Sequence, residues 1–208
     1  KAYGRKSQEL PHFFAPLHRK RIDAPLVADI HFDYTLARAA INAGADKIRI
    51  NPGNIGDTDR VRQVADAARS AGIPIRVGVN SGSLEKEILA EYGGVCAEGL
   101  AESALKNAEI LEQLGFNDIV LSLKASDVKM NNEAYRIADR RSAYPLHIGV
   151  TEAGTVNSGI IKSSIGIGSL LLDGIGDTMR VSLTADPVRE VAAAKEILKA
   201  LDLREGAI

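Results

Sequence analysis

Cysteine, tryptophan and aromatic residues in general are scarce in this sequence of 208 residues. Cys96 is its single cysteine, tryptophan is absent, and aromatic residues make up 4% of the chain. One cysteine excludes an internal disulfide framework and is typical of a reducing cytoplasm, where we expect the protein to be located. So few aromatic rings argue against the stacking platforms that bind single-stranded nucleic acid.

An excess of charge is missing as well, because 26 Lys and Arg residues face 27 Asp and Glu residues and leave a net charge of -1. This balance gives no general basic field for nucleic acid or an acidic membrane surface, so any cationic site must be local. No apolar run reaches the roughly 18 residues that span a bilayer, and the N-terminus lacks a signal-peptide pattern. We therefore expect neither a membrane nor a nucleic-acid partner.

Six short apolar runs alternate with amphipathic helical patterns. The runs cover residues 26–31, 47–51, 75–79, 118–124, 146–151 and 179–183. The helical patterns cover 34–43, 57–70, 100–114, 131–141 and 158–172, with further helices predicted within 8–20, from about 83 and from 186 onward. Near-continuous apolar runs are typical of parallel strands that are buried on both faces. The alternation predicts an α/β fold with right-handed crossovers.

The choice between an open sheet and a barrel depends on the residues at the strand ends. A Rossmann sheet needs a glycine-rich turn after its first strand, and this sequence has Asp29-Ile30-His31-Phe32 there. Polar residues instead come after several different strands, as in TIM barrels. We predict a single domain over residues 1–208, a TIM (β/α)8-type barrel whose first two strands would precede residue 1.

The strand ends carry four cations. Because side chains alternate along a strand, residues two apart share a face. The pairs are Asp29 with His31, Arg49 with Asn51, Arg76 with Asn80 (through Gly78) and Arg180 with Ser182, while Lys124 ends its own strand. Arginine offers forked donors and lysine a point charge, so the pattern predicts a phosphate or carboxylate site that would suit a doubly phosphorylated small molecule. The alternative is a set of scattered structural ion pairs.

Glu152 is the candidate acid or base, since it comes after an apolar run and precedes the turn at Gly154. Nearby cations would lower its pKa and burial would raise it. The alternative is a structural partner for Arg180 or Lys124. His31 is a candidate proton donor, and Asp29 is a candidate to orient His31 or a nearby arginine.

Turns rich in glycine and serine are candidates to hold phosphate oxygens through backbone amides. They cover residues 51–54, 80–83, 154–159 and the glycines at 166 and 168. Cys96 has no partner at metal-ligand spacing, so no metal site is predicted.

Six stretches resemble the family of 4-hydroxy-3-methylbut-2-enyl diphosphate synthase, an enzyme of the non-mevalonate isoprenoid pathway. They are residues 27–34 (VADIHFDY), 47–56 (KIRINPGNIG), 76–84 (RVGVNSGSL), 122–127 (SLKASD), 149–154 (GVTEAG) and 174–183 (GIGDTMRVSL). The resemblance runs in order from about residue 22 to the end of the chain.

The resemblance implies a (β/α)8 barrel that binds 2-C-methyl-D-erythritol 2,4-cyclodiphosphate. It implies that the diphosphate is held by Arg49, Arg76, Lys124 and Arg180, with help from Asn51, Asn80, Thr151 and Ser182. Glu152 would be the acid/base group, with Asp29 and His31 close by. The reaction it implies is a two-electron reductive ring opening and dehydroxylation, with ferredoxin or flavodoxin as the electron donor.

The resemblance also implies a four-iron four-sulfur cluster, held by three cysteines and a glutamate of a separate C-terminal domain, and a homodimer in which one chain's cluster caps the other's barrel. This chain ends where that domain would begin, and one cysteine cannot ligate such a cluster. We expect the chain by itself to bind no cluster and to complete no turnover. Two alternatives stay open: another phosphate-handling barrel lyase or isomerase with Lys124 as a Schiff-base amine, or a non-catalytic truncated scaffold.

Overall fold

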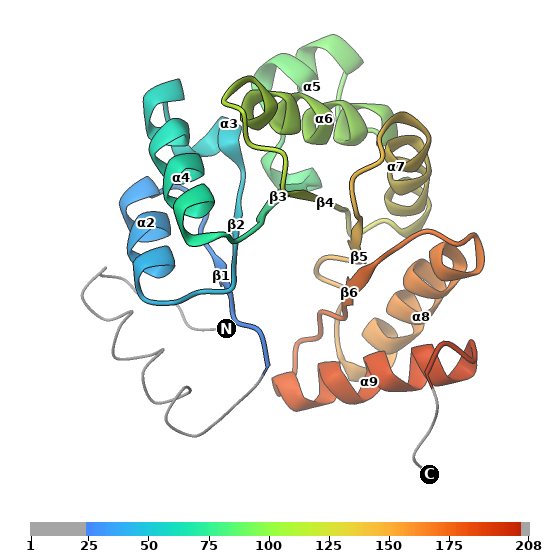
Figure 1. Cartoon of the computed structure of the whole chain (residues 1–208). Coiled ribbons are helices and arrows are strands. Elements are labelled where there is room, and N and C mark those ends of the chain that lie inside the picture. Colours follow the sequence, from blue (N-terminus) through green and yellow to red (C-terminus); the bar gives the residue numbers. More distant parts are fainter. Residues whose placement is uncertain (1–23, 205–208) are drawn as a thin grey trace. The chain divides into compact units, whose positions relative to one another are not determined.

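The computed structural model describes residues 24–204, so the helix predicted within residues 8–20 lies outside the described part. All six predicted strands are present, in the order and near the positions expected (Figure 1). They are β1 (Val27–Asp29), β2 (Lys47–Ile50), β3 (Ile75–Asn80), β4 (Ile119–Lys124), β5 (His147–Gly149) and β6 (Thr178–Arg180).

The strand pairings are parallel, as the alternation of strands and helices predicts. β1 pairs with β2, β2 with β3, and β5 with β6. A parallel bridge also joins Leu121 of β4 to Leu146, just before β5. Four strands end earlier than predicted: β1 at Asp29, β2 at Ile50, β5 at Gly149 and β6 at Arg180. Strand alternation therefore does not govern the side-chain directions of His31, Asn51, Thr151 and Ser182.

Eight helices of the described residues separate or follow the strands. They are α2 (Tyr34–Asn42), α3 (Pro52–Ile55), α4 (Thr58–Ala71), α5 (Lys86–Tyr92), α6 (Ala97–Gln113), α7 (Val128–Arg141), α8 (Val156–Leu172) and α9 (Pro187–Ala200). A 3₁₀ turn, η2 (Ser81–Ser83), comes after β3. α3 and η2 are too short to produce a helical hydrophobic period, so the sequence pattern does not predict them. None of these described helices is long and apolar enough to cross a membrane.

Helix ends explain much of this segmentation. Aspartate side chains accept hydrogen bonds from first-turn amides at Asp33, Asp57, Asp127 and Asp186, which satisfies donors that a helix leaves without partners. Gly72 ends α4 with a left-handed φ of +64°, as its position after the predicted helix indicates. By contrast, Gly166 and Gly168 lie inside α8, so the prediction of a phosphate-binding turn there is wrong.

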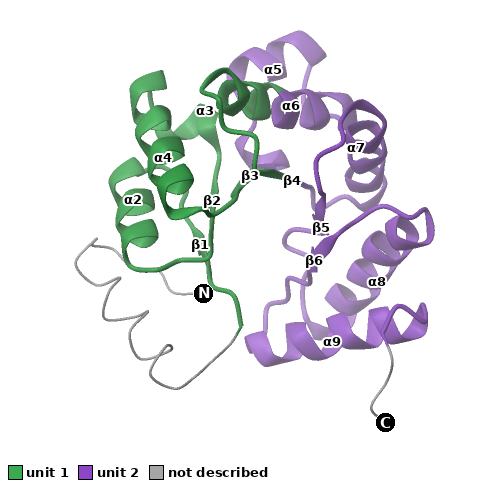
Figure 2. Ribbon diagram, in the orientation of Figure 1, with its two compact units in different colours: residues 1–78, 106–120 green, residues 79–105, 121–208 purple. Residues whose placement is uncertain are grey.

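The chain divides into two compact units (Figure 2). Unit 1 comprises residues 1–78 and 106–120, and unit 2 comprises 79–105 and 121–208. In unit 1, α2 packs against α4, and the fully buried core includes Ala40, Ile48 and Val64. The division runs within β3, α6 and β4 rather than through linkers, so the single domain stays a prediction.

In unit 2, Tyr135 of α7 is fully buried and ties two strands together. Its hydroxyl accepts a hydrogen bond from the amide of Leu123 in β4 at 3.1 Å and donates one to the carbonyl of His147 in β5 at 2.8 Å. A buried tyrosine hydroxyl needs such partners. His147 is itself buried, and its Nδ1 lies 2.8 Å from the hydroxyl of Thr178 in β6.

Candidate functional site

Arg49 of β2 is the centre of a charged cluster in unit 1. It lies opposite Asp29 in the β1–β2 register and opposite Arg76 in the β2–β3 register, so three charged residues form one row across the strands. Only 7% of Arg49 is exposed. Its Nη1 donates to Asp29 Oδ1 at 2.9 Å, and its Nη2 donates to the carbonyl of Gly78 at 2.8 Å. The buried guanidinium therefore has a carboxylate and a carbonyl as acceptors.

His31 lies against the same guanidinium, although it is outside β1. Its Nε2 is 3.5 Å from Asp29 Oδ1, and Arg49 Nη1 lies 3.1 Å from Nδ1 and 3.2 Å from Nε2. An arginine N–H can only donate, so this contact favours a neutral imidazole with a lone pair facing Arg49. Asp29 contacts both the imidazole and the guanidinium, and its role in orienting them stays a prediction.

The electrostatics of the two titratable groups follow from this geometry. Burial raises the pKa of Asp29, but the charges of Arg49 and His31, the Arg49 hydrogen bond and the charge of Arg76 together outweigh it, so the pKa lies below its usual value. Burial and the Arg49 charge lower the pKa of His31, and Asp29 opposes them only in part. The pair is therefore a carboxylate beside a neutral imidazole at pH 7.

Asn51 comes after β2 and caps the short helix α3. Its Oδ1 accepts a hydrogen bond from the amide of Gly53 at 3.2 Å, and the same amide donates to Asn107 Oδ1 at 2.6 Å. Asn107 lies in the part of α6 that belongs to unit 1. Asn51 Nδ2 is buried and has no hydrogen-bond partner. This side chain therefore still has a donor for a ligand.

Unit 2 contains the other two strand-end cations, Lys124 and Arg180. Lys124 ends β4, is 5% exposed, and has its Cε close to Gly149 of β5, 3.1 Å from where a Cβ would lie. Arg180 ends β6, opposite Gly149 in the register. Its Nη2 donates to Ser182 Oγ at 3.0 Å, which places these two side chains together as predicted. The Nε of Arg180 is buried without a hydrogen-bond partner.

Glu152 lies just beyond β5 in an unusual backbone conformation. Its φ is +48°, in the left-handed region that glycine favours. The neighbouring Thr151 is anchored by its amide, which donates to the carbonyl of Ala125 at 3.2 Å. Within residues 24–204, the Glu152 carboxylate forms no hydrogen bond and no ion pair. In particular, it pairs with neither Lys124 nor Arg180, the structural partners considered for it. Strained non-glycine residues of this kind concentrate at functional sites.

The predicted site residues thus fall into two sets. Unit 1 contains Asp29, His31, Arg49, Asn51 and Arg76, and unit 2 contains Asn80, Lys124, Thr151, Glu152, Arg180 and Ser182. That both sets serve one ligand stays a prediction. Sequence reasoning assigned no role to Gly78 and Gly149, beside which Arg49 and Lys124 lie. Glycine inside a strand is itself a signal of close approach, and could have identified both.

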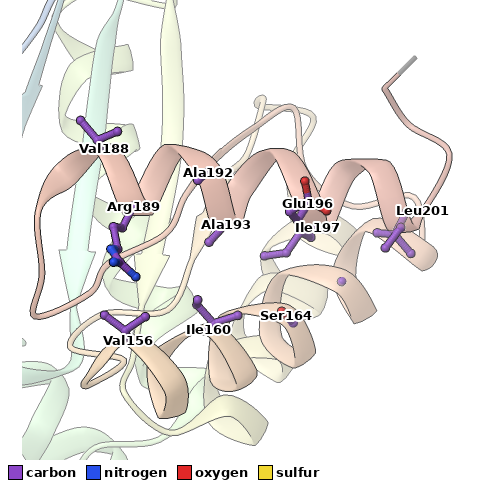
Figure 3. A pocket seen from close by; sticks show the side chains of 12 residues that line it. Val156, Ile160, Ser164, Val188, Arg189, Ala192, Ala193, Glu196, Ile197 and Leu201 are labelled. Atoms are coloured by element: carbon purple, nitrogen blue, oxygen red, sulfur yellow. The ribbon is translucent and has the colours of Figure 1, made fainter. Parts of the chain in front are cut away.

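A groove of about 670 Å³ lies between α8 and α9 in unit 2 (Figure 3). Its lining is mainly aliphatic and includes Val156, Ile160, Val188 and Ile197. None of the predicted site residues lines it. The groove is therefore separate from the strand-end chemistry.

The residues of this chain do not fit an iron–sulfur cluster. No group of three His, Cys, Asp or Glu side chains within the described residues is arranged to hold a metal ion. Cys96, the single cysteine, accepts a hydrogen bond from the amide of Gly99 at 3.3 Å. Cluster ligation needs several thiolates, so no chemical step is assigned to such a group in this chain.

Residues 14–195 match the family described as the GcpE TIM-barrel domain. The chain is 61% identical over 189 residues to 4-hydroxy-3-methylbut-2-en-1-yl diphosphate synthase (flavodoxin) of Caldanaerobacter subterraneus subsp. tengcongensis, covering 90% of this chain and 53% of that protein. It is 60% identical over 189 residues to the protein of the same name from Ruminiclostridium cellulolyticum, covering 90% and 54%. The chain spans about half the length of these curated relatives.

Among solved structures, dihydropteroate synthase from Stenotrophomonas maltophilia is similar with a TM-score of 0.59 at 16% identity, over 97% of this chain and 76% of that one. The enzyme from Thermus thermophilus gives 0.58 at 16% identity, over 93% and 78%. Identities this low concern the fold alone. Together with the family match, they confirm the predicted fold class, a parallel α/β TIM barrel.

Proposed function

The chain belongs to the GcpE TIM-barrel family, and we propose that it is the substrate-binding barrel of an oxidoreductase of the non-mevalonate isoprenoid pathway. The reaction is the reductive opening of 2-C-methyl-D-erythritol 2,4-cyclodiphosphate to 4-hydroxy-3-methylbut-2-enyl diphosphate. The observation that carries the proposal is the setting of Arg180, whose Nε is buried without an acceptor while Ser182 fixes its Nη2. An oxygen of a phosphate group would supply the missing acceptor.

Binding is the role of the strand-end donors. Arg49, Arg76, Lys124 and Arg180 hold the diphosphate, and Asn51, Asn80, Thr151 and Ser182 add hydrogen bonds. Support for this role comes from the burial of Arg49 and Lys124, at 7% and 5% exposure, because charge-assisted hydrogen bonds strengthen away from water. Asn51 Nδ2 supplies a further buried donor.

Proton transfer is the role of Glu152, with Asp29 and His31. The reaction breaks a ring C–O bond and expels a hydroxyl as water, consuming two electrons and two protons, so an acid is needed at the departing oxygen. Glu152 has no partner among the described residues that would compete for its proton. Neutral His31, held between Arg49 and Asp29, is a second proton carrier at the same reaction.

The electrons come from outside this chain. The relatives are named as flavodoxin enzymes, and we propose flavodoxin as the donor, with ferredoxin as the alternative. The four-iron four-sulfur cluster and the homodimer implied by the resemblance belong to the complete enzyme. Because this chain's own residues do not fit the cluster, we propose that the 208-residue chain binds substrate but does not turn it over.

Titration calorimetry of this chain with the cyclodiphosphate at low salt tests the proposal. We expect saturable binding that weakens as salt rises, because the contacts are ionic. Arg180→Ala should weaken the binding. Gly168→Ala in α8 should not, because a Cβ there meets no atom within 4 Å. No detectable binding by a folded wild-type chain would leave the non-catalytic scaffold as the explanation. Borohydride trapping of a carbonyl substrate on Lys124 would instead favour a lyase or isomerase.

A further inference from the structure

Gly78 of β3 leaves the space that the Arg49 side chain occupies. A Cβ built on Gly78 would lie 1.8 Å from Arg49 Nε, 2.7 Å from Cζ and 2.8 Å from Nη2. Heavy atoms do not approach so closely, so any residue other than glycine must displace the guanidinium. The close approach also sets the hydrogen bond from Arg49 Nη2 to the Gly78 carbonyl, at 2.8 Å.

The two strand glycines differ in what restricts them. A Cβ on Gly149 would lie 2.5 Å from the backbone carbonyl oxygen of Arg180, so a side chain there would disturb the β5–β6 pairing itself. At Gly78 the three nearest heavy atoms all belong to the Arg49 side chain. That side chain is flexible at its far end and can move without moving a strand. Glycine is therefore needed at position 78 because the Arg49 side chain occupies the space of a Cβ, and not because main-chain atoms do.

We propose that Gly78 is a positioning residue that fixes the Arg49 guanidinium between Asp29 and His31. With the guanidinium in place, Nη1 lies 2.9 Å from Asp29 Oδ1 and 3.1 Å from His31 Nδ1. A methyl group at position 78 moves Arg49, so Asp29 loses its closest cation and His31 loses the donor that faces its lone pair. The consequence for ligand binding rests on the proposed function. The positioning of Arg49 by Gly78 does not depend on that function.

The decisive experiment is an NMR titration of His31 in the 208-residue chain, comparing wild type, Gly78→Ala, Arg49→Ala and the double variant. We expect the pKa of His31 to rise in both single variants, because both take the cation away from the imidazole. The double variant should match Arg49→Ala, because position 78 acts only through Arg49. No shift in Gly78→Ala, or a further shift in the double variant, would overturn the proposal.

The folded state of the variants is a second test of the proposal. If Gly78→Ala does not fold, the double variant shows whether the clash with Arg49 is the cause, since Arg49→Ala removes the atoms that the new methyl group meets. Recovery of the folded state in the double variant supports the proposal, and failure to recover overturns it. Gly168→Ala in α8 is the matched control, because a Cβ there meets no atom within 4 Å. It should leave the pKa of His31 and the folded state unchanged.

The ligand arm uses inorganic pyrophosphate and calorimetry. We expect Gly78→Ala to lower the affinity for pyrophosphate about tenfold, which corresponds to the loss of roughly one charge-assisted hydrogen bond. In the Arg49→Ala background, the same substitution should lower the affinity no further. A further loss in that background contradicts the proposal. If wild type itself does not bind pyrophosphate or the cyclodiphosphate, the proposed function fails, while the His31 titration still decides the role of Gly78.

Discussion

Arg49 in unit 1 and Arg180 in unit 2 are both strand-end arginines, and the structure treats their charges differently. Arg49 is paired with the Asp29 carboxylate at 2.9 Å. Arg180 has the hydroxyl of Ser182 as its acceptor, its Nε has no hydrogen-bond partner, and no carboxylate of the described chain lies within ion-pair distance. One charge is balanced inside the protein, and the other is left for something outside it.

The difference separates two tasks that a cation can perform. A buried arginine beside a carboxylate is stable without a ligand and adjusts the protonation of its neighbours. A cation without a carboxylate keeps more of its field for an incoming anion, although the folded protein is less stable for holding it. If the proposed function is right, we expect Arg49 to act mainly on the protonation of Asp29 and His31, and Arg180 to contribute more to the attraction for the diphosphate.

The largest effect is expected at Glu152, a carboxylate of unit 2 that forms no ion pair with any residue in 24–204. Glu152→Gln in the complete holoenzyme should lower turnover by at least about 100-fold, the range of a lost acid or base, while substrate affinity stays within about tenfold. Steady-state kinetics and calorimetry measure the two quantities. Turnover close to that of wild type would show that the proton comes from another group.

The comparison of the arginines themselves comes next. Arg180→Ala should lower the affinity for the cyclodiphosphate by about 10- to 100-fold, since it removes charged hydrogen bonds of roughly 1.5–3 kcal/mol. Arg49→Ala should lower this affinity less. It should also lower the free energy of unfolding, because Asp29 then lacks its partner. Calorimetry and denaturant unfolding of both variants check this. Equal effects of the two variants on binding and on stability would remove the distinction between the units.

A smaller effect is expected from the pH dependence of unit 1. The folded-state pKa of His31 lies below its ordinary 6.5, so the unfolded chain binds the proton more tightly. The stabilising contribution is therefore complete above pH 6.5 and is lost as pH falls from there through the folded-state pKa. Denaturant unfolding at a series of pH values should show this decline in wild type and not in His31→Gln. A decline of the same size in His31→Gln would assign it to another group.

The contribution of Asp29 to stability depends on pH in the same direction as that of His31, but at lower pH. Its folded-state pKa is lowered, so its contribution is present above its unfolded value and is lost as pH falls through the folded one. Asp29→Asn should remove this second decline and leave the His31 step in place, although shifted. Asp29 is partly exposed, so we expect a modest change.

The smallest effect concerns the backbone at Glu152. With φ at +48°, replacing Glu152 by glycine should relieve strain and raise the free energy of unfolding by about 0.5 kcal/mol, after the entropy that glycine adds to the unfolded chain. Glu152→Ala keeps the strain and serves as the control. An equal gain in both variants would attribute the stabilisation to loss of the charge instead.

The sequence contains enough to predict the strands and most of the helices. Buried parallel strands read as apolar runs, and Asp33, Asp57 and Asp186 precede the helices that they cap. Asp29 lies near His31 and Arg180 near Ser182, at 3.5 and 3.0 Å, as the sequence pairing predicts. The expected reason was wrong, however, because His31 and Ser182 lie beyond the ends of β1 and β6.

The remaining features depend on distances along the chain that no local pattern reports. The contact of Arg49 with Gly78 joins residues 29 positions apart and requires the β2–β3 register. The bond from Gly53 to Asn107 joins residues 54 apart. The left-handed backbone of Glu152 could not be anticipated either, since the residue type argues against it.

The close approach of Arg49 to Gly78 also constrains how this sequence can change over time. While Arg49 is present, a larger residue at position 78 displaces it, so we expect such changes to be disfavoured. Once Arg49 is lost, position 78 is released and can accumulate alanine or serine without further harm. Arginine could then return to position 49 only after glycine had returned to 78. The two positions therefore form an epistatic pair in which the order of substitutions decides whether the change can be reversed.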